Sequence, residues 1–107
     1  MNQNDWLDFH KASCDSMYEI SKSKSNDYSG TDNVFNNFMN VERLGIASTE
    51  EGFLVRMTDK LTRLSQFCKT GVLKVKDESV EDTLLDLCNY TLLMAAYIKE
   101  KKRNEKN

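Results

Sequence analysis

The segment spanning residues 78–98, ESVEDTLLDLCNYTLLMAAYI, constrains the fold more than any other part of the chain. At about 100° per residue, one side of a helix formed here would carry a polar stripe of Glu78, Asp82, Asp86 and Asn89. Leucines lie both opposite this stripe and beside it, and a helix that is apolar on nearly all sides is expected to be buried on most of its surface. Buried carboxylates are costly unless they are paired or bound to a metal. The segment therefore predicts a largely buried helix whose acidic groups need partners.

The first residues of the acidic stripe can also be explained by helix capping and by the helix dipole. Ser79 and Asp82 have the spacing of a capping box, in which both side chains satisfy backbone N–H groups. Acidic residues in a first turn, such as Glu78, also suit the helix dipole. Asp86 and Asn89 lie one and two turns further along, beyond the reach of this explanation. A metal or polar-ligand site and a capped, solvated helix face both remain open for the stripe.

Apolar residues recur at helical spacing in four segments, which we expect to form helices over about 4–22, 33–44, 49–69 and 79–101 or beyond. Ser48 and Glu51 form a capping box before the third segment, and Gly71 is placed to end it. The chain contains no proline. Short links between amphipathic helices favour an all-α, four-helix antiparallel bundle in a single domain, 1–107, with a basic tail from about residue 99 to 107.

The composition excludes several classes of function. Seventeen acidic residues outnumber 15 basic ones, so binding to nucleic acid is not expected. No stretch approaches the ~18 apolar residues of a membrane span, and the N-terminus has no signal-peptide pattern, which predicts a cytoplasmic protein. Cys14, Cys68 and Cys88 fit no zinc or redox spacing and are expected to pack as small core residues. The excess apolar surface of the fourth segment predicts a partner subunit, as in a homodimer or tetramer.

The polar segment 22–30, KSKSNDYSG, contains groups that suit a nucleotide. Lys24 could hold phosphates, Asp27 could accept hydrogen bonds, and Tyr28 could stack on a base. Ordinary loops have the same composition, so a plain connection between two helices is the alternative.

Asp59, Lys60 and Arg63 lie within about one turn of the third expected helix. An exposed ion pair between Asp59 and Arg63, at i,i+4, is one interpretation. In the other, Asp59 contributes to a metal shell while Lys60 and Arg63 face phosphate oxygens, which the planar fork of arginine binds with two hydrogen bonds. Clustered carboxylate oxygens suit Mg²⁺ or Mn²⁺ better than zinc.

Three motifs, in this order, give the chain a resemblance to a known family: KSNDY at 24–28, DKLTRL at 59–64 and DESVEDTLLDLCNY at 77–90. Together they resemble the nucleotide modification associated domain 1 family of phages and bacteria. The resemblance implies an all-α domain similar to the MazG-like nucleoside triphosphate pyrophosphatases. Members of that wider group hold Mg²⁺ with acidic residues on two helices, cleave nucleotides between the α- and β-phosphates, and form dimers or tetramers.

The resemblance also implies roles for individual residues. The metal ligands would be Glu78, Asp82 and Asp86. Asp59, Lys60 and Arg63 would form the catalytic group on the other helix, and the nucleotide would be held by Lys24, Asp27, Tyr28 and Asn89. The expected activity is a Mg²⁺-dependent nucleotide pyrophosphohydrolase in the cytoplasm of a bacterial or phage-infected cell. However, the Glu-x-x-Glu pair of MazG-like enzymes is replaced here by Asp59 between two arginines. The alternative is a non-catalytic phage protein that sequesters a nucleotide, such as a signal nucleotide, or binds and inhibits a host protein.

Overall fold

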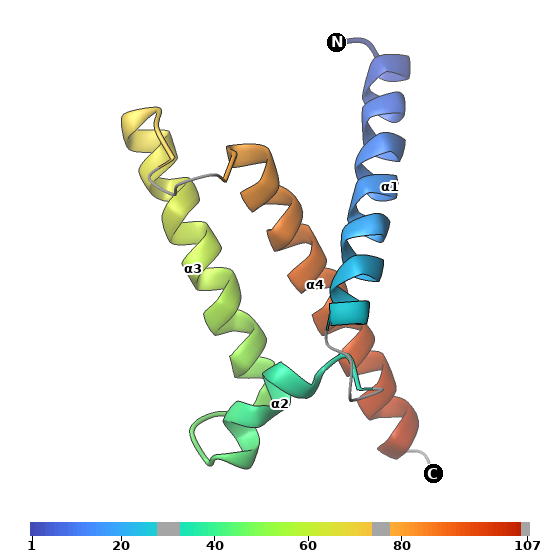
Figure 1. Cartoon of the computed structure of the whole chain (residues 1–107), viewed down its shortest axis with the longest axis vertical. Helices are drawn as coiled ribbons and strands as arrows, with labels where there is room; N and C mark the ends of the chain where they lie inside the picture. The colour runs from blue at the N-terminus through green and yellow to red at the C-terminus, as the bar shows by residue number, and fades with distance from the viewer. Residues whose placement is uncertain (28–32, 74–77, 106–107) are drawn as a thin grey trace. The chain divides into compact units, whose positions relative to one another are not determined.

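The computed structural model describes residues 1–27, 33–73 and 78–105, and these residues form four α-helices (Figure 1). The predicted all-α class is confirmed. The chain divides into two compact units, Met1–Val34 and Phe35–Asn107, which we describe separately. Among the described residues, none of the helices combines the length and the apolar character needed to cross a membrane.

The first unit consists of helix α1, Gln3–Asp27. At its start, the Asn2 side chain accepts a hydrogen bond of 2.8 Å from the backbone N–H of Asp5. The expected end near residue 22 is wrong, because α1 continues for five more residues. Lysine favours a helix, Ser and Asn are only moderately unfavourable in one, and neither glycine nor proline occurs in this stretch to interrupt it. Lys24 and Asp27 therefore belong to α1 rather than to a loop.

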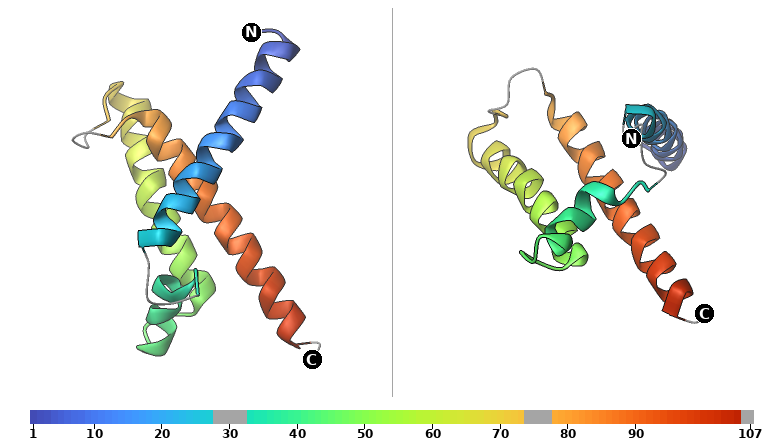
Figure 2. Two further views of the ribbon diagram at one scale, coloured as in Figure 1. Left: turned by 45° about the vertical axis from the view of Figure 1, so that its right-hand side comes forward. Right: turned by 60° about the horizontal axis from the view of Figure 1, so that its bottom comes forward.

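The second unit contains helices α2 (Asn36–Arg43), α3 (Thr49–Thr70) and α4 (Val80–Glu105). The two long helices α3 and α4 run antiparallel side by side, and the short helix α2 packs against α3 (Figures 1 and 2). α2 is shorter than the expected 33–44. The boundaries expected for α3 are confirmed to within one residue, and α4 extends to residue 105, so that the expected basic tail is helical as far as it is described.

The helix ends follow the local chemistry of the sequence. The capping box at the start of α3 is present, because Ser48 Oγ accepts from the N–H of Glu51 and Glu51 accepts from the N–H of Ser48, both at 3.1 Å. Gly71 ends α3 in the left-handed conformation, with φ 73°, which only glycine adopts without strain. A second capping box precedes α4, where Asp82 accepts from the N–H of Ser79 and Ser79 Oγ accepts from the N–H of Asp82.

The core of the second unit is built from aromatic rings. Phe38 of α2 stacks on Phe53 of α3 with ring centroids 4.1 Å apart. On α4, the ring centroid of Tyr90 lies 6.0 Å from that of Phe38, and the ring centroid of Tyr97 lies 5.8 Å from that of Phe53 and 5.5 Å from that of Phe35, the residue just before α2. The helix α2 can approach closely because Gly52 of α3 has no side chain: a Cβ there would lie 2.9 Å from Val41 Cγ2 and 3.1 Å from the Phe38 carbonyl oxygen.

The residues of α3 and α4 that face each other follow a heptad spacing of alternating four and three. We call them the inner seam; all of its members are buried or half-buried. On α3 the inner seam comprises Phe53, Met57, Lys60, Leu64 and Phe67. On α4 it comprises Thr83, Leu87, Tyr90, Met94 and Tyr97.

The cysteines do not pack as expected. Cys14, Cys68 and Cys88 are all exposed thiols. The helical period placed them correctly on or beside apolar stripes. Cys68 and Cys88, however, come one position after inner-seam residues, so each points about 100° away from the core.

Candidate functional site

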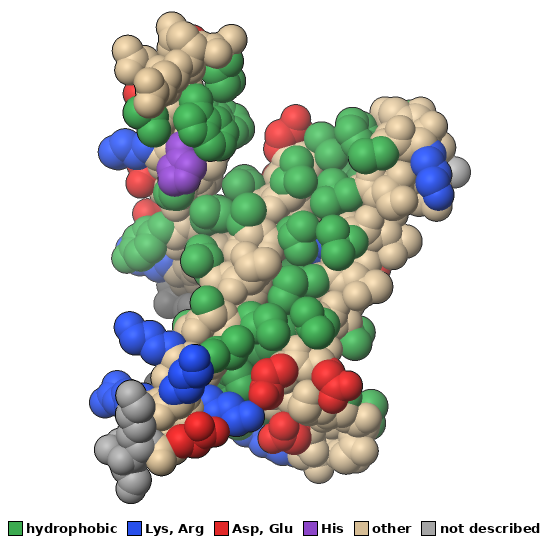
Figure 3. Space-filling view, turned by 180° about the vertical axis from the view of Figure 1, so that it is seen from behind, with side chains coloured by type: hydrophobic (Ala, Val, Ile, Leu, Met, Phe, Trp, Pro, Cys, Tyr) green, Lys and Arg blue, Asp and Glu red, His purple; other side chains and the backbone are tan. Residues whose placement is uncertain are grey.

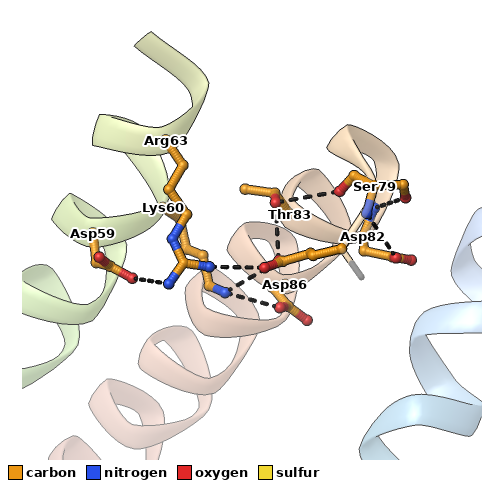
Figure 4. Close-up of polar contacts among 8 residues, drawn as sticks. Asp59, Lys60, Arg63, Ser79, Asp82, Thr83 and Asp86 are labelled. Atoms are coloured by element: carbon orange, nitrogen blue, oxygen red, sulfur yellow. Dashed lines mark hydrogen bonds and ion pairs between the residues drawn. The ribbon is translucent and has the colours of Figure 1, made fainter. Parts of the chain in front are cut away.

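The polar centre of the second unit is a cluster of charged side chains between α3 and α4, which we call the ion cluster (Figure 4). It comprises Asp59, Lys60 and Arg63 from α3, Glu78 from the residues just before α4, and Asp86 from the second turn of α4. Lys60 enters the cluster because it occupies an inner-seam position. Asp86 is one position before Leu87 of the inner seam, and so it lies at the edge of the helix contact.

Lys60 is the central cation of the cluster. Its ammonium donates to Asp86 Oδ2 at 3.0 Å and to Glu78 Oε1 at 3.5 Å. Burial lowers the pKa of Lys60, but the hydrogen bond with Asp86 and the negative charges of Asp86 and Glu78 together outweigh burial and raise it. Lys60 is therefore a charged ammonium at neutral pH, although its side chain is only 11 % exposed.

Arg63 forms the outer part of the cluster. One nitrogen of its guanidinium lies 2.8 Å from Glu78 Oε2, and the other lies 3.1 Å from Asp59 Oδ2. The predicted ion pair between Asp59 and Arg63 at i,i+4 is therefore present. The Asp59 side chain is 62 % exposed, whereas that of Glu78 is only 18 % exposed. Glu78 accepts a third partner, the hydroxyl of the fully buried Thr83, at 2.9 Å.

The cluster contains part of the expected site. The structure brings together Asp59, Lys60, Arg63, Glu78 and Asp86, which come from the two motifs at 59–64 and 77–90. Asp82 instead closes the capping box with Ser79, as the alternative interpretation of the stripe predicted, and Figure 4 shows its carboxylate on that side of the turn.

The remaining expected residues lie elsewhere. Asn89 is buried on α4, one turn beyond Asp86. Lys24 is exposed on α1 in the other unit, and Asp27 is in the last turn of the same helix. Tyr28 lies outside the described residues. The sequence analysis missed Thr83, whose hydroxyl donates to Glu78 of the ion cluster. Its position five residues after Glu78 was the available signal.

The donor set suits a divalent cation that keeps part of its hydration. Carboxylate oxygens of Glu78 and Asp86 converge on one point, which is occupied by the Lys60 nitrogen. Mg²⁺ is commonly held by one or two carboxylates together with waters and substrate phosphates, so these two groups fit it. No group of three or more histidine, cysteine or acidic residues with the geometry to hold a metal occurs in the part of the chain that the structure describes.

Comparison with known proteins found no match, whether among protein-family models, curated proteins or solved structures. The protein is therefore described by its structure: it is an all-α chain with a half-buried cluster of two cations and three carboxylates between two antiparallel helices.

Proposed function

We propose that the ion cluster binds the phosphate groups of a nucleotide together with Mg²⁺ or Mn²⁺, and that the protein is a nucleotide pyrophosphohydrolase-like enzyme acting on a nucleoside triphosphate or a related nucleotide. The observation that carries this proposal is the convergence of Glu78 and Asp86 on a single point, which the Lys60 ammonium occupies and beside which Arg63 lies. The motifs at 59–64 and 77–90, which resemble those of the nucleotide modification associated domain 1 family, both contribute to the same cluster and support the proposal.

In the proposed site, Glu78 and Asp86 would hold the metal ion, and Lys60 would have to leave the point between them. Its long, flexible side chain can do so while its ammonium stays beside the carboxylates. The released ammonium and the guanidinium of Arg63 would then stabilise negative charge on the phosphates. Asp59 is exposed at the rim, where it can orient an attacking water. A bound Mg²⁺ would polarise the phosphate and lower the pKa of a coordinated water.

A second candidate, sequestration of a nucleotide without cleavage, is favoured by one specific observation. Only two carboxylates converge within the described cluster, because Asp82 is engaged in the helix cap and Asp59 pairs with Arg63. Two carboxylates and two cations are sufficient to bind a metal–phosphate complex. Turnover additionally requires an oriented water, for which Asp59 is the available base.

The test is a thermal-shift screen of nucleotides with and without Mg²⁺, followed by chromatography of the same mixtures to detect products. A ligand at about 100 times its Kd would stabilise the fold by ~2.7 kcal/mol, which is a clear shift. We expect stabilisation by at least one nucleotide in the presence of Mg²⁺, and the loss of this effect in Asp86→Asn. Glu100→Gln, which removes an exposed carboxylate from the same helix, is the matched control.

The products distinguish the two candidates. Release of a monophosphate and pyrophosphate supports the enzyme, whereas recovery of the intact nucleotide supports sequestration. Both candidates are contradicted if no nucleotide stabilises the protein, or if Asp86→Asn and Glu100→Gln respond alike.

A further inference from the structure

Helix α1 carries two metal-ligating side chains in contact with each other, those of His10 and Cys14. The Nδ1 atom of His10 lies 3.7 Å from Sγ of Cys14. His10 is the only histidine in the chain, and both side chains are exposed. The spacing of the three cysteines among themselves indicates no metal site, whereas a histidine and a cysteine at i,i+4 lie on one face of a helix.

The separation of the two atoms suits coordination of a single metal ion. Bonds of about 2.0–2.1 Å to nitrogen and about 2.3 Å to sulfur, meeting at an angle of about 110–120°, place the two ligand atoms about 3.6–3.8 Å apart. The observed distance of 3.7 Å falls within this range. A cation can therefore bind to both atoms without a change in the helix backbone.

The contact between the two side chains involves a proton that a metal ion would replace. When the imidazole proton is on Nε2, the Nδ1 atom is an acceptor and the thiol donates to it. Metal binding releases the thiol proton to solvent, and the cation then lies between the thiolate sulfur and the ring nitrogen. The site thus uses lone pairs that already face each other.

Met17 supplies a third ligand on the same face of α1. At about 100° per residue, His10, Cys14 and Met17 fall within an arc of about 60°. Side chains on a helix lean toward its N-terminus, and methionine is long and flexible, so the thioether of Met17 can reach Cys14 from the following turn. The acidic side chains of α1 lie on the other side of the helix: Asp5, Asp8, Asp15 and Glu19.

This donor set indicates which metal the face would bind. Thiolate and thioether sulfur are soft ligands that select Cu(I), and imidazole also suits copper, whereas the carboxylate oxygens preferred by Mg²⁺ and Mn²⁺ are absent from this face. Cu(I) is stable with three ligands. Zn²⁺ is almost always bound by four in structural sites, and this face offers one nitrogen and two sulfur atoms.

We propose that His10, Cys14 and Met17 form a surface site for Cu(I) on α1, with Nδ1, Sγ and Sδ as the ligand atoms. Trp6 supports the imidazole, since its ring meets that of His10 edge-on with centroids 5.7 Å apart. Figure 3 shows the histidine at the surface, with hydrophobic side chains of α1 next to it. The inference does not depend on the proposed function, because the ion cluster lies in the other unit and contains neither sulfur nor imidazole.

The first experiment measures the affinity of the full chain for Cu(I), by competition with the chromophoric chelator bicinchoninate under anaerobic, reducing conditions. The reference protein carries Cys68→Ser and Cys88→Ser, so that Cys14 is its only thiol. We expect one Cu(I) per chain. In this background Cys14→Ser and His10→Gln should each raise the Kd at least about tenfold. Lys11→Gln, which changes an exposed side chain about 100° away on the same helix, is the matched control.

The third ligand is tested by Met17→Leu, which keeps an apolar side chain of similar size but removes the sulfur. This substitution should raise the Kd for Cu(I) by at least about threefold, because one of three bonds to the metal is lost. Circular dichroism confirms that each variant remains helical. An unchanged Kd would overturn the assignment of Met17.

The second experiment locates the ion through Trp6, which is the only tryptophan in the chain and lies beside His10. Its fluorescence should change until one Cu(I) per chain has been added, and should not respond in Cys14→Ser. An excess of Mg²⁺ and nucleotide should leave this titration unchanged, since these ligands are proposed to bind the other unit.

Three outcomes would overturn the proposal. In the first, the reference protein and its Cys14→Ser variant bind Cu(I) equally well. In the second, His10→Gln has no more effect than Lys11→Gln. In the third, Zn²⁺ displaces Cu(I) from the chain at equal concentration, which would overturn the choice of metal.

Discussion

The ammonium of Lys60 on α3 lies 3.0 Å from the carboxylate of Asp86 on α4, and both side chains are largely shielded from water, with exposures of 11 % and 23 %. This pair joins two helices through residues 26 positions apart in the sequence. Removing one member of a shielded ion pair lowers the stability of the fold more than removing one member of an exposed pair. The reason is that the remaining charge stays shielded from water without its partner.

Substitution of Lys60 by methionine should therefore lower the free energy of unfolding by about 2–4 kcal/mol, since Asp86 would lose its ammonium donor. Lys69→Met, an exposed substitution on the same helix, should have little effect. Urea denaturation measures both. The double variant Lys60→Met/Asp86→Asn should recover part of the loss, and additive effects in this double-mutant cycle would contradict the pairing.

The same Lys60→Met variant should bind divalent cations more tightly. Without the ammonium, Glu78 and Asp86 still converge but have no competing cation between them. Titration with Mn²⁺ in the absence of nucleotide, followed by electron paramagnetic resonance, should show an affinity at least about tenfold higher than that of the wild type, equivalent to ~1.4 kcal/mol. An unchanged or weaker affinity would argue against a metal site at these two carboxylates.

The two aspartates of α4 should respond differently to replacement by asparagine. Asp82→Asn keeps a side-chain oxygen that can accept the hydrogen bond from the N–H of Ser79, so stability and Mg²⁺-dependent nucleotide binding should change little. Asp86→Asn removes a charge from the ion cluster and should abolish that binding. Isothermal titration with a nucleotide and Mg²⁺ compares them directly. Equal losses in both variants would show that Asp82 also serves the site.

Stability should decrease in acid through the cap of α3. Hydrogen bonds from the backbone N–H and the side chain of Ser48 lower the pKa of Glu51 below its usual 4.5. The unfolded chain therefore binds a proton more readily than the folded chain, and stability is lost as the pH falls from about 4.5 through the lower pKa of the folded state. Glu51→Gln should show a shallower decrease of Tm between pH 5 and 3. Identical slopes would contradict this contribution.

Gly52→Ala should destabilise the protein although alanine favours helices. The added Cβ would lie 2.9 Å from Val41 Cγ2 and 3.1 Å from the Phe38 carbonyl oxygen, so α2 would have to move. Overpacking of this kind costs about 1–3 kcal/mol, and because one of the close atoms belongs to the backbone, we expect a cost in the upper part of this range, above the gain of ~1 kcal/mol in helix propensity. Val41→Ala in the same background should restore part of the loss in denaturation experiments.

Local chemistry made several features of the fold predictable from the sequence. The starts of α3 and α4 follow from Ser48 and Ser79, each with its acidic partner three residues later, and the end of α3 follows from Gly71. The ion pair between Asp59 and Arg63 was also predictable, because both lie on one helix at i,i+4. Each of these features depends on residues within about one turn of one another.

Features that depend on how two helices face each other were harder to predict. The pairing of Lys60 with Asp86 requires the alignment of α3 against α4, which no local pattern encodes. The exposure of Cys68 and Cys88 was missed for a related reason. The apolar stripe of each helix contains two adjacent series of residues at heptad spacing, and the helical period alone does not show which of them turns toward the core.

The ion cluster has a counterpart at the other end of the helix pair, where Lys101 of α4 lies 2.9 Å from Glu50 of α3. Between these two charged ends, the contact consists mainly of aromatic rings and methionine side chains. If α4 shifted along α3 by a single turn, about 5.4 Å, the ion pairs at both ends would be broken at once. The ion pairs at the two ends are therefore formed together only at the observed alignment of α3 and α4, so they favour this alignment over one shifted by a turn.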